Sequence, residues 1–101
     1  MHANVSTKMR QRVYKRDGYR CALCDCTHYI QIHHVVPRGA GGKVESEQNM
    51  ITLCATCHAQ AHGHDVFNTG ITAEDMEQYC VEYLADHYAP DWNPWRRKPG
   101  T

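Results

Sequence analysis

The sequence predicts a single α+β domain over residues 1–101, built from a hairpin of two short strands with a helix at either end. Three observations support this prediction. A length of 101 residues is typical of one small domain. A β-branched run at 29–36 and a short apolar run at 50–53 are typical of strands. Apolar residues recur at helical spacing within 6–16 and 72–88, which indicates two helices.

The first predicted helix, residues 6–16, is recognised by its two ends. Ser6 or Thr7 can cap the first turn, and apolar residues four apart share one face of the segment. Gly18 follows the last turn, where glycine readily takes the left-handed conformation that ends a helix. The segment therefore predicts one amphipathic helix before the first cysteines.

The predicted hairpin occupies the middle of the chain. The run YIQIHHVV at 29–36 ends at a proline, and residues 38–49 form a polar, glycine-rich loop. The apolar run at 50–53 then returns the chain towards its start. A short helix is expected over 55–62, ended by Gly63.

The last predicted helix covers about 72–88. Thr72 and Asp75 have the spacing of a capping box, and a proline follows the helix. One face carries residues expected to pack, namely Met76, Cys80, Tyr83, Leu84 and His87. The basic tail, residues 90–101, is too rich in proline and charge to fold by itself.

Four cysteines form two knuckles of C-x-x-C spacing, Cys21 with Cys24 and Cys54 with Cys57. The first residues show no apolar segment of a secretory signal, so we expect a cytoplasmic protein with reduced thiols. Cys54 to His58 also fit the pattern that attaches c-type haem, but the two knuckles together favour one structural Zn²⁺. A domain this small has a thin core, so such a cross-link is expected. The remaining two cysteines, Cys26 and Cys80, are expected not to bind it.

The formal net charge of zero conceals two segregated regions. Residues 1–20 hold six basic side chains against one aspartate, whereas residues 74–91 hold six acidic side chains and no Lys or Arg. A basic end favours a polyanion partner such as DNA, and the acidic region cannot lie against phosphates. No apolar run is long enough to span a membrane, so no membrane partner is expected.

Four histidines lie within a stretch of about thirty residues that overlaps the predicted zinc site: His33, His34, His58 and His62. His58 and His62 are four residues apart, so both lie on one face of a helix, as metal ligands must. A neutral imidazole near pH 7 can bind a metal ion or act as a general base. A lone histidine is more often structural, but four of them in one such frame are hard to explain as incidental.

The segments RDGYRCALC, IHHVVPRGAGG, Asn49-Met50-Ile51 and LCATCHAQAH resemble the HNH endonucleases, of ββα-metal and treble-clef-like fold. The likeness is to the small free-standing enzymes of phages and prophages, and it covers residues 16–63. It implies that the core of the domain is a ββα-metal unit, with the two outer helices flanking it.

The resemblance also implies roles for single residues. His34 stands at the position of the general base, and His33 and His58 at positions of metal ligands. Asn49 is the middle letter of the motif, which orients the base or joins the metal ligands. His62 matches a histidine that either binds the metal or contacts the phosphate.

His33 departs from the aspartate that many members of the family have at this position. An imidazole in place of a carboxylate makes the ligand set rich in nitrogen and removes a negative charge. This should favour Mn²⁺, Co²⁺, Ni²⁺ or Zn²⁺ over Mg²⁺. We therefore expect Mn²⁺ or Ni²⁺ to support cleavage better than Mg²⁺.

The predicted function is that of a metal-dependent DNA endonuclease of low sequence specificity, which hydrolyses phosphodiester bonds with a single metal ion and a histidine base. Four basic residues are expected to contact phosphates: Arg38, Arg12, Lys15 and Arg16. The family link suggests a role in phage DNA packaging beside a terminase, and we expect a monomer or weak dimer. The alternative is a non-catalytic zinc module for DNA or protein binding, which would not need the histidines and Asn49.

Overall fold

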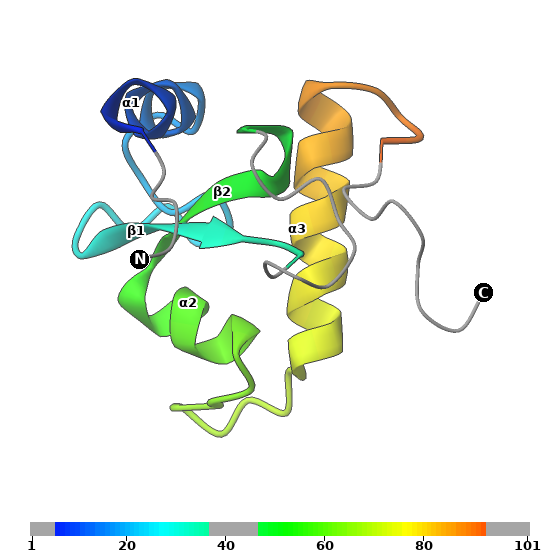
Figure 1. The fold of residues 1–101 in the computed structure, drawn as a ribbon. Coiled ribbons are helices and arrows are strands. Elements are labelled where there is room, and N and C mark those ends of the chain that lie inside the picture. The colour runs from blue at the N-terminus through cyan, green and yellow to red at the C-terminus, as the bar shows by residue number, and fades with distance from the viewer. Residues whose placement is uncertain (1–5, 37–46, 93–101) are drawn as a thin grey trace, which may run out of the picture.

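The computed structural model describes residues 6–36 and 47–92 and confirms the α+β class (Figure 1). In chain order, its elements are α1 (Thr7–Arg16), β1 (Ile30–His34), the 3-10 helix η1 (Glu47–Asn49), β2 (Met50–Cys54), α2 (Ala55–Ala61) and α3 (Ala73–His87). The predicted phosphate contact Arg38 and the tail beyond residue 92 lie outside the described residues.

The two strands pair in an antiparallel hairpin, with Ile30 opposite Cys54 and His34 opposite Met50. All five residues of β2 are buried. β2 runs directly into α2, because Cys54 is both the last residue of the strand and the N-cap of the helix. No loop therefore separates the hairpin from α2. The sequence had predicted a strand over 50–53 and a helix over 55–62, which differ from the observed bounds by one residue each.

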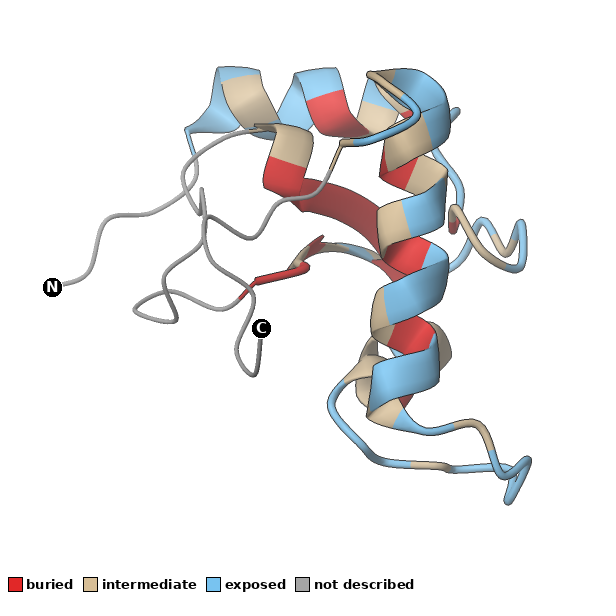
Figure 2. Ribbon diagram, turned by 90° about the vertical axis from the view of Figure 1, so that its right-hand side faces the viewer, coloured by how far each residue is buried: buried red, intermediate tan, exposed pale blue. Residues whose placement is uncertain are grey.

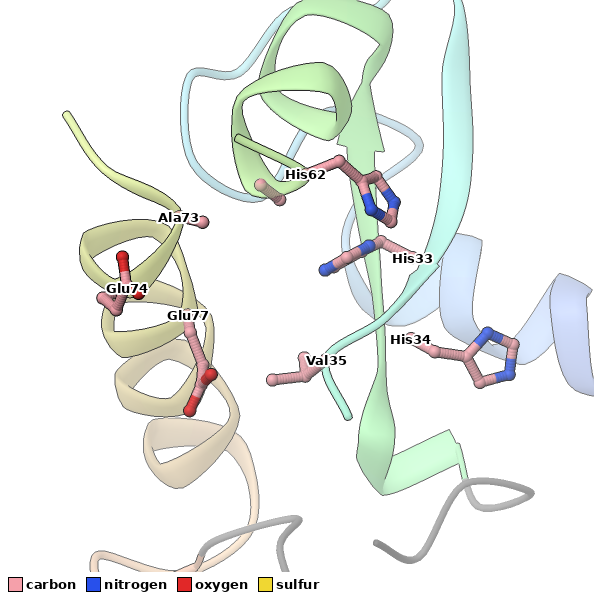
Figure 3. A pocket seen from close by; sticks show the side chains of 8 residues that line it. His33, His34, Val35, His62, Ala73, Glu74 and Glu77 are labelled. Carbon is pink, nitrogen blue, oxygen red and sulfur yellow. The ribbon is translucent and has the colours of Figure 1, made fainter. Parts of the chain in front are cut away.

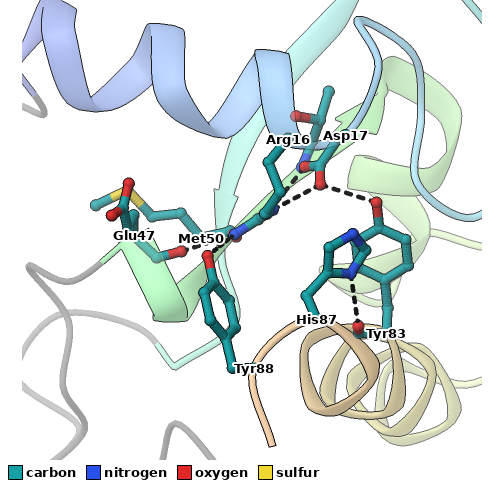
Figure 4. A network of polar contacts seen from close by, with 8 residues as sticks. Arg16, Asp17, Glu47, Met50, Tyr83, His87 and Tyr88 are labelled. Carbon is teal, nitrogen blue, oxygen red and sulfur yellow. Dashed lines mark hydrogen bonds and ion pairs between the residues drawn. The ribbon is translucent and has the colours of Figure 1, made fainter.

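α1 is joined to the hairpin by the side chain of Arg16 (Figure 4). Its guanidinium donates to both carboxylate oxygens of Asp17, at 2.7 and 2.9 Å. It also donates to the backbone oxygens of Glu47 (3.0 Å) and Met50 (2.6 Å) and to the hydroxyl of Tyr88 (2.8 Å). These five hydrogen bonds equal the number of N–H donors that a guanidinium has.

The carboxylate of Asp17 extends the same network to α3. It accepts hydrogen bonds from the backbone N–H of Thr52 and from the hydroxyl of Tyr83, both at 2.9 Å. Its side chain is fully buried. Burial and the hydrogen bond to Asp17 raise the pKa of Tyr83 well above its ordinary value. The pair Arg16 and Asp17 thus fixes α1, the hairpin and α3 to one another.

The capping box of α3 is confirmed, because Thr72 and Asp75 exchange hydrogen bonds of 3.0 Å. The buried residues of α3 are Met76, Cys80 and Leu84, which recur along one side of the helix (Figure 2). The prediction that His87 packs in the core was wrong, because its side chain is exposed. Its ring lies on the ring of Tyr83, with 4.5 Å between the centroids, and its Nδ1 meets the backbone oxygen of that residue.

The core is one cluster that includes three of the cysteines and residues of the hairpin and α3: Cys21, Val35, Ile51, Leu53, Cys54, Cys80 and Leu84. Trp92 packs on this cluster and donates to the backbone oxygen of Gln48 at 2.9 Å. Among the described residues, no helix is both long and apolar enough to cross a membrane.

Candidate metal centres

The first centre is formed by the four cysteines of the two knuckles. The Sγ atoms of Cys21, Cys24, Cys54 and Cys57 all lie within 4.8 Å of one another. Those of Cys24 and Cys54 are 3.6 Å apart, and all six cysteines of the chain are free thiols. Tetrahedral Zn²⁺ with bonds of about 2.3 Å separates its thiolates by a little under 4 Å. The cluster therefore has the donor set and spacing of a structural zinc site.

Without a cation, two of these thiols resist ionisation, those of Cys24 and Cys57, whereas at Cys54 hydrogen bonds outweigh burial and lower the pKa. Burial, followed by the charge of Cys21, raises the pKa of Cys57 far above its ordinary value. Burial raises the pKa of Cys24 to about 11. A bound divalent ion reverses this balance, since coordination deprotonates a thiol outright. We therefore expect Cys24 and Cys57 to be thiols in the free cluster and thiolates when a metal ion is bound.

The second centre is formed by three histidines from β1 and α2. The ring nitrogens of His33, His58 and His62 lie within 4.8 Å of one another. Their ring centroids are 5.0 Å apart for His33 and His58, 5.3 Å for His33 and His62, and 4.9 Å for His58 and His62. His62 is the C-cap of α2, one turn after His58. Three imidazoles converging on one point form a candidate metal-ligand set.

The protonation of two of these rings, those of His33 and His58, suits ligation. Burial, and then the charges of His58 and His62, lower the pKa of His33 to about 3. Burial also lowers the pKa of His58. Neutral imidazole is the form that binds metal, and it suits first-row transition ions. The rings of His33 and His58 are therefore ready for an ion at neutral pH.

Gln31 orients one of the three rings. Its Oε1 accepts a hydrogen bond from Nδ1 of His58. Nδ1 then carries the proton, so the lone pair of Nε2 is available to an ion; such contacts fix ligand tautomers in metal sites. This residue was not predicted from the sequence. Strand alternation could have found it, because residues 31 and 33 of one strand share a face.

The other two residues of the predicted catalytic set lie beside the three histidines. The ring of His34 points away from those of His33 and His62 (Figure 3), as expected for neighbours on a strand. Asn49 is fully buried, and its amide bonds both backbone groups of Val36 at 2.9 and 3.1 Å. Its backbone oxygen accepts from the N–H of Val35 at 3.0 Å. Asn49 therefore fixes the chain just after His34.

The predicted DNA contacts on α1 are not equivalent in the structure. The prediction for Arg16 does not fit, because its five donors are engaged within the protein and its side chain is only 13% exposed. Lys15 is exposed. Arg12 is exposed too and pairs with Glu47 at 2.9 Å, a surface contact that costs little to break. Arg12 and Lys15 remain available to a phosphate backbone.

A cavity of about 160 Å³ adjoins the three histidines. Its walls come from β1, the end of α2 and the first two turns of α3: His33, His34, Val35, Ala61, His62, Ala73, Glu74 and Glu77. The two glutamates were not among the predicted site residues. In the sequence they belonged to the acidic region, which was expected to lie away from phosphates, whereas the packing of α3 brings these two carboxylates to the histidines.

Comparison with known proteins identifies the family to which these two centres point. The sequence model of one family, described as HNH endonuclease, matches residues 21–64, which include both centres and Asn49. The chain belongs to the HNH endonuclease family. This assignment confirms the resemblance from which the roles of the histidines were inferred.

Two characterised proteins are similar in sequence to parts of this HNH protein, and their names point to different activities. Anaredoxin from Nostoc sp. is 34% identical over 56 residues, which cover 54% of this chain and 72% of that protein. The type IV methyl-directed restriction enzyme EcoKMcrA from Escherichia coli is 38% identical over 40 residues. That match covers 40% of this HNH protein but only 14% of the restriction enzyme.

Proposed function

We propose that this protein is a metal-dependent DNA endonuclease that hydrolyses phosphodiester bonds with one metal ion and a histidine base. The observation that carries the proposal is the convergence of His33, His58 and His62 within the HNH region. The restriction enzyme among the relatives supports a DNA substrate. A structural zinc at the four cysteines would hold the frame on which this centre is built.

The three imidazoles would hold the catalytic ion, which when bound would polarise a phosphoryl oxygen and stabilise the departing 3′ oxygen. His34 is the proposed base: a ring nitrogen takes a proton from water as the water oxygen bonds to phosphorus. The bond from phosphorus to the 3′ oxygen breaks, and that oxygen then gains a proton. Since His33 and His34 point to opposite sides of β1, the scissile phosphate is expected to straddle the end of this strand.

The proposed ion is a transition metal rather than Mg²⁺. All three ring ligands are nitrogen donors, and Mg²⁺ prefers oxygen. We therefore keep the expectation that Mn²⁺ or Ni²⁺ supports cleavage better than Mg²⁺, with Co²⁺ and Zn²⁺ as further candidates.

DNA is proposed to bind through its backbone along α1. Arg12 and Lys15 line two shallow hollows, of about 490 and 500 Å³, and Lys8 and Tyr19 line the second of them. Contacts of this kind carry little sequence information, which agrees with low specificity. Arg38 stays a proposed contact outside the described residues. The proposed setting is the cytoplasm, with phage DNA packaging beside a terminase as the role and a monomer or weak dimer as the form.

Plasmid nicking by the zinc-loaded protein tests the proposal. His34→Ala should keep the fold and the structural zinc yet lose nicking by a factor of about 100 to 10,000. His28→Ala, which changes an exposed histidine outside both centres, is the matched control. Parental nicking by His34→Ala would refute the base. A parent that fails to nick with every divalent ion offered would favour the alternative, a non-catalytic zinc module.

A further inference from the structure

A carboxylate from outside the HNH-matching region reaches the cavity beside the three histidines. α3 begins at residue 73, after the family match ends at residue 64. Glu74 and Glu77 of this helix line the cavity together with His33 and His62. Figure 3 shows the side chain of Glu77 extending from α3 on the side of the cavity that Val35 borders.

The fold fixes Glu77 in this place. The capping box of Thr72 and Asp75 sets the start of α3, and the buried residues Met76 and Cys80 set its rotation against the hairpin. Glu77 lies one turn after Ala73, so both face the cavity. Glu77 is half-buried, whereas Glu74 is exposed. Of the two glutamates, Glu77 is therefore held more closely against the centre.

Glu77 does not complete the ligand set directly. In the described part of the chain, the atoms within 4.8 Å of one another at this centre belong to three histidines and to no carboxylate. A cavity of about 160 Å³ holds several water molecules, since each needs only about 10–15 Å³ of such space. It is too small for a nucleotide, because ligand pockets usually measure about 300 Å³ or more. Water can therefore connect the ion to the carboxylate.

We propose that Glu77 is a positioning residue of the histidine metal centre, whose carboxylate accepts a hydrogen bond from a water molecule on the ion. Three neutral imidazoles leave the two positive charges of the ion uncompensated, and a carboxylate in the same half-buried cavity offsets one of them. The hydrogen bond also orients the water and raises the affinity for the ion. This inference rests on the proposed histidine centre and adds to it a residue beyond the HNH region.

Metal affinity tests the inference without any DNA. The four cysteines are first loaded with zinc, and Mn²⁺ is then titrated by calorimetry. Glu77→Leu should weaken Mn²⁺ binding by about 10-fold to 100-fold, as is usual when a partner of metal-bound groups is lost. Glu77→Gln keeps an acceptor but removes the charge, so its loss should be smaller. Glu82→Leu and Glu82→Gln are matched controls, because Glu82 lies on α3 outside the cavity and contacts Gln78.

A second measurement separates positioning from a merely structural role. The relaxation of water protons by bound Mn²⁺ reports how its water molecules are held, and both Glu77 variants should change it at full metal occupancy. Their urea midpoints should equal those of the Glu82 variants. If Glu77→Leu does not fold, Glu77→Gln carries the test.

One outcome would refute the role of Glu77 alone, and another would refute the histidine centre itself. Mn²⁺ affinity within about twofold of the parent in both Glu77 variants would refute the role of Glu77 and leave the histidine centre intact. A parent that binds Mn²⁺ no better than a His33→Ala, His58→Ala double variant would refute the histidine centre, and with it the role of Glu77.

Discussion

Nδ1 of His58 donates its hydrogen bond to Oε1 of Gln31, a residue of β1 that lies 27 positions earlier in the chain. This contact leaves Nε2 of His58 as the free lone pair of the ring. It also joins the first strand of the hairpin to the helix that carries two of the three imidazoles.

Gln31→Leu should therefore weaken Mn²⁺ binding at the histidine centre by about 10-fold to 100-fold, because the tautomer and orientation of His58 are no longer fixed. Calorimetric titration of the zinc-loaded protein measures this. Gln78→Leu is the matched control, since Gln78 contacts Glu82 on α3. Equal affinities for the two variants would contradict the prediction.

Asp17→Ala should lower the free energy of unfolding by about 3–5 kcal/mol, because it leaves the largely buried guanidinium of Arg16 without its ionic partner. Urea denaturation followed by circular dichroism measures the change. Asp86→Ala, an exposed acid on α3, should cost little. A loss below about 1 kcal/mol for Asp17→Ala would show that this buried pair is not the link between the elements.

Lys15→Ala should weaken DNA binding uniformly across sequences and reduce the slope of log affinity against log salt by about one. Fluorescence anisotropy with two unrelated duplexes between low and moderate salt measures both. Arg20→Ala serves as control, because Arg20 lies 3.8 Å from Asp25 and does not line either hollow of α1. An identical slope for parent and Lys15→Ala would show that Lys15 does not contact a phosphate and that DNA binds to another surface.

Asp65 gives the stability of the loop between α2 and α3 a defined pH dependence. Hydrogen bonds from the backbone N–H groups of Thr69 and Gly70 lower the pKa of Asp65 to about 2, against an ordinary value of 3.8. Because the folded value is the lower one, this stabilisation is complete above the unfolded pKa and is lost as the pH falls towards 2.

Asp65→Asn should therefore be less stable than the parent by a margin that is constant from about pH 7 to 5 and shrinks below about pH 4. Urea denaturation of both proteins across this range measures the margin. Acid competes with zinc for the thiols equally in both proteins, so the difference isolates Asp65. If the difference in stability already changes between about pH 7 and 5, its pH dependence comes from a group other than Asp65.

Cys24→Ser should reduce the zinc content from one equivalent per chain and abolish cooperative unfolding, because structural zinc can contribute about 10 kcal/mol or more to folding. Cys26→Ser should keep both properties, since Cys26 lies outside the four-cysteine cluster and contacts the backbone oxygen of His28. Zinc analysis and thermal melts measure the pair. If Cys26→Ser lost zinc and Cys24→Ser kept it, Cys26 and not Cys24 would be the ligand.

The sequence was most informative where the signal is local. The cap of α3 by Thr72 and Asp75 and the spacing of the knuckles need only near neighbours, and both were predicted correctly. Arg16 was misjudged because its backbone acceptors and Tyr88 lie 31 to 72 positions away, where no local pattern reveals them. Glu77 was missed for the same reason, since only the packing of α3 brings it to the histidines.

The direct junction of β2 with α2 couples the two candidate metal centres. α2 has only seven residues, and a helix this short is not stable by itself, so its order depends on tertiary contacts, among them the four-cysteine cluster at its first turn. His58 directly follows Cys57 on that helix. Under the proposed function, a chain without zinc would lack the ordered helix that carries His58 and His62, so cleavage would require both metal ions.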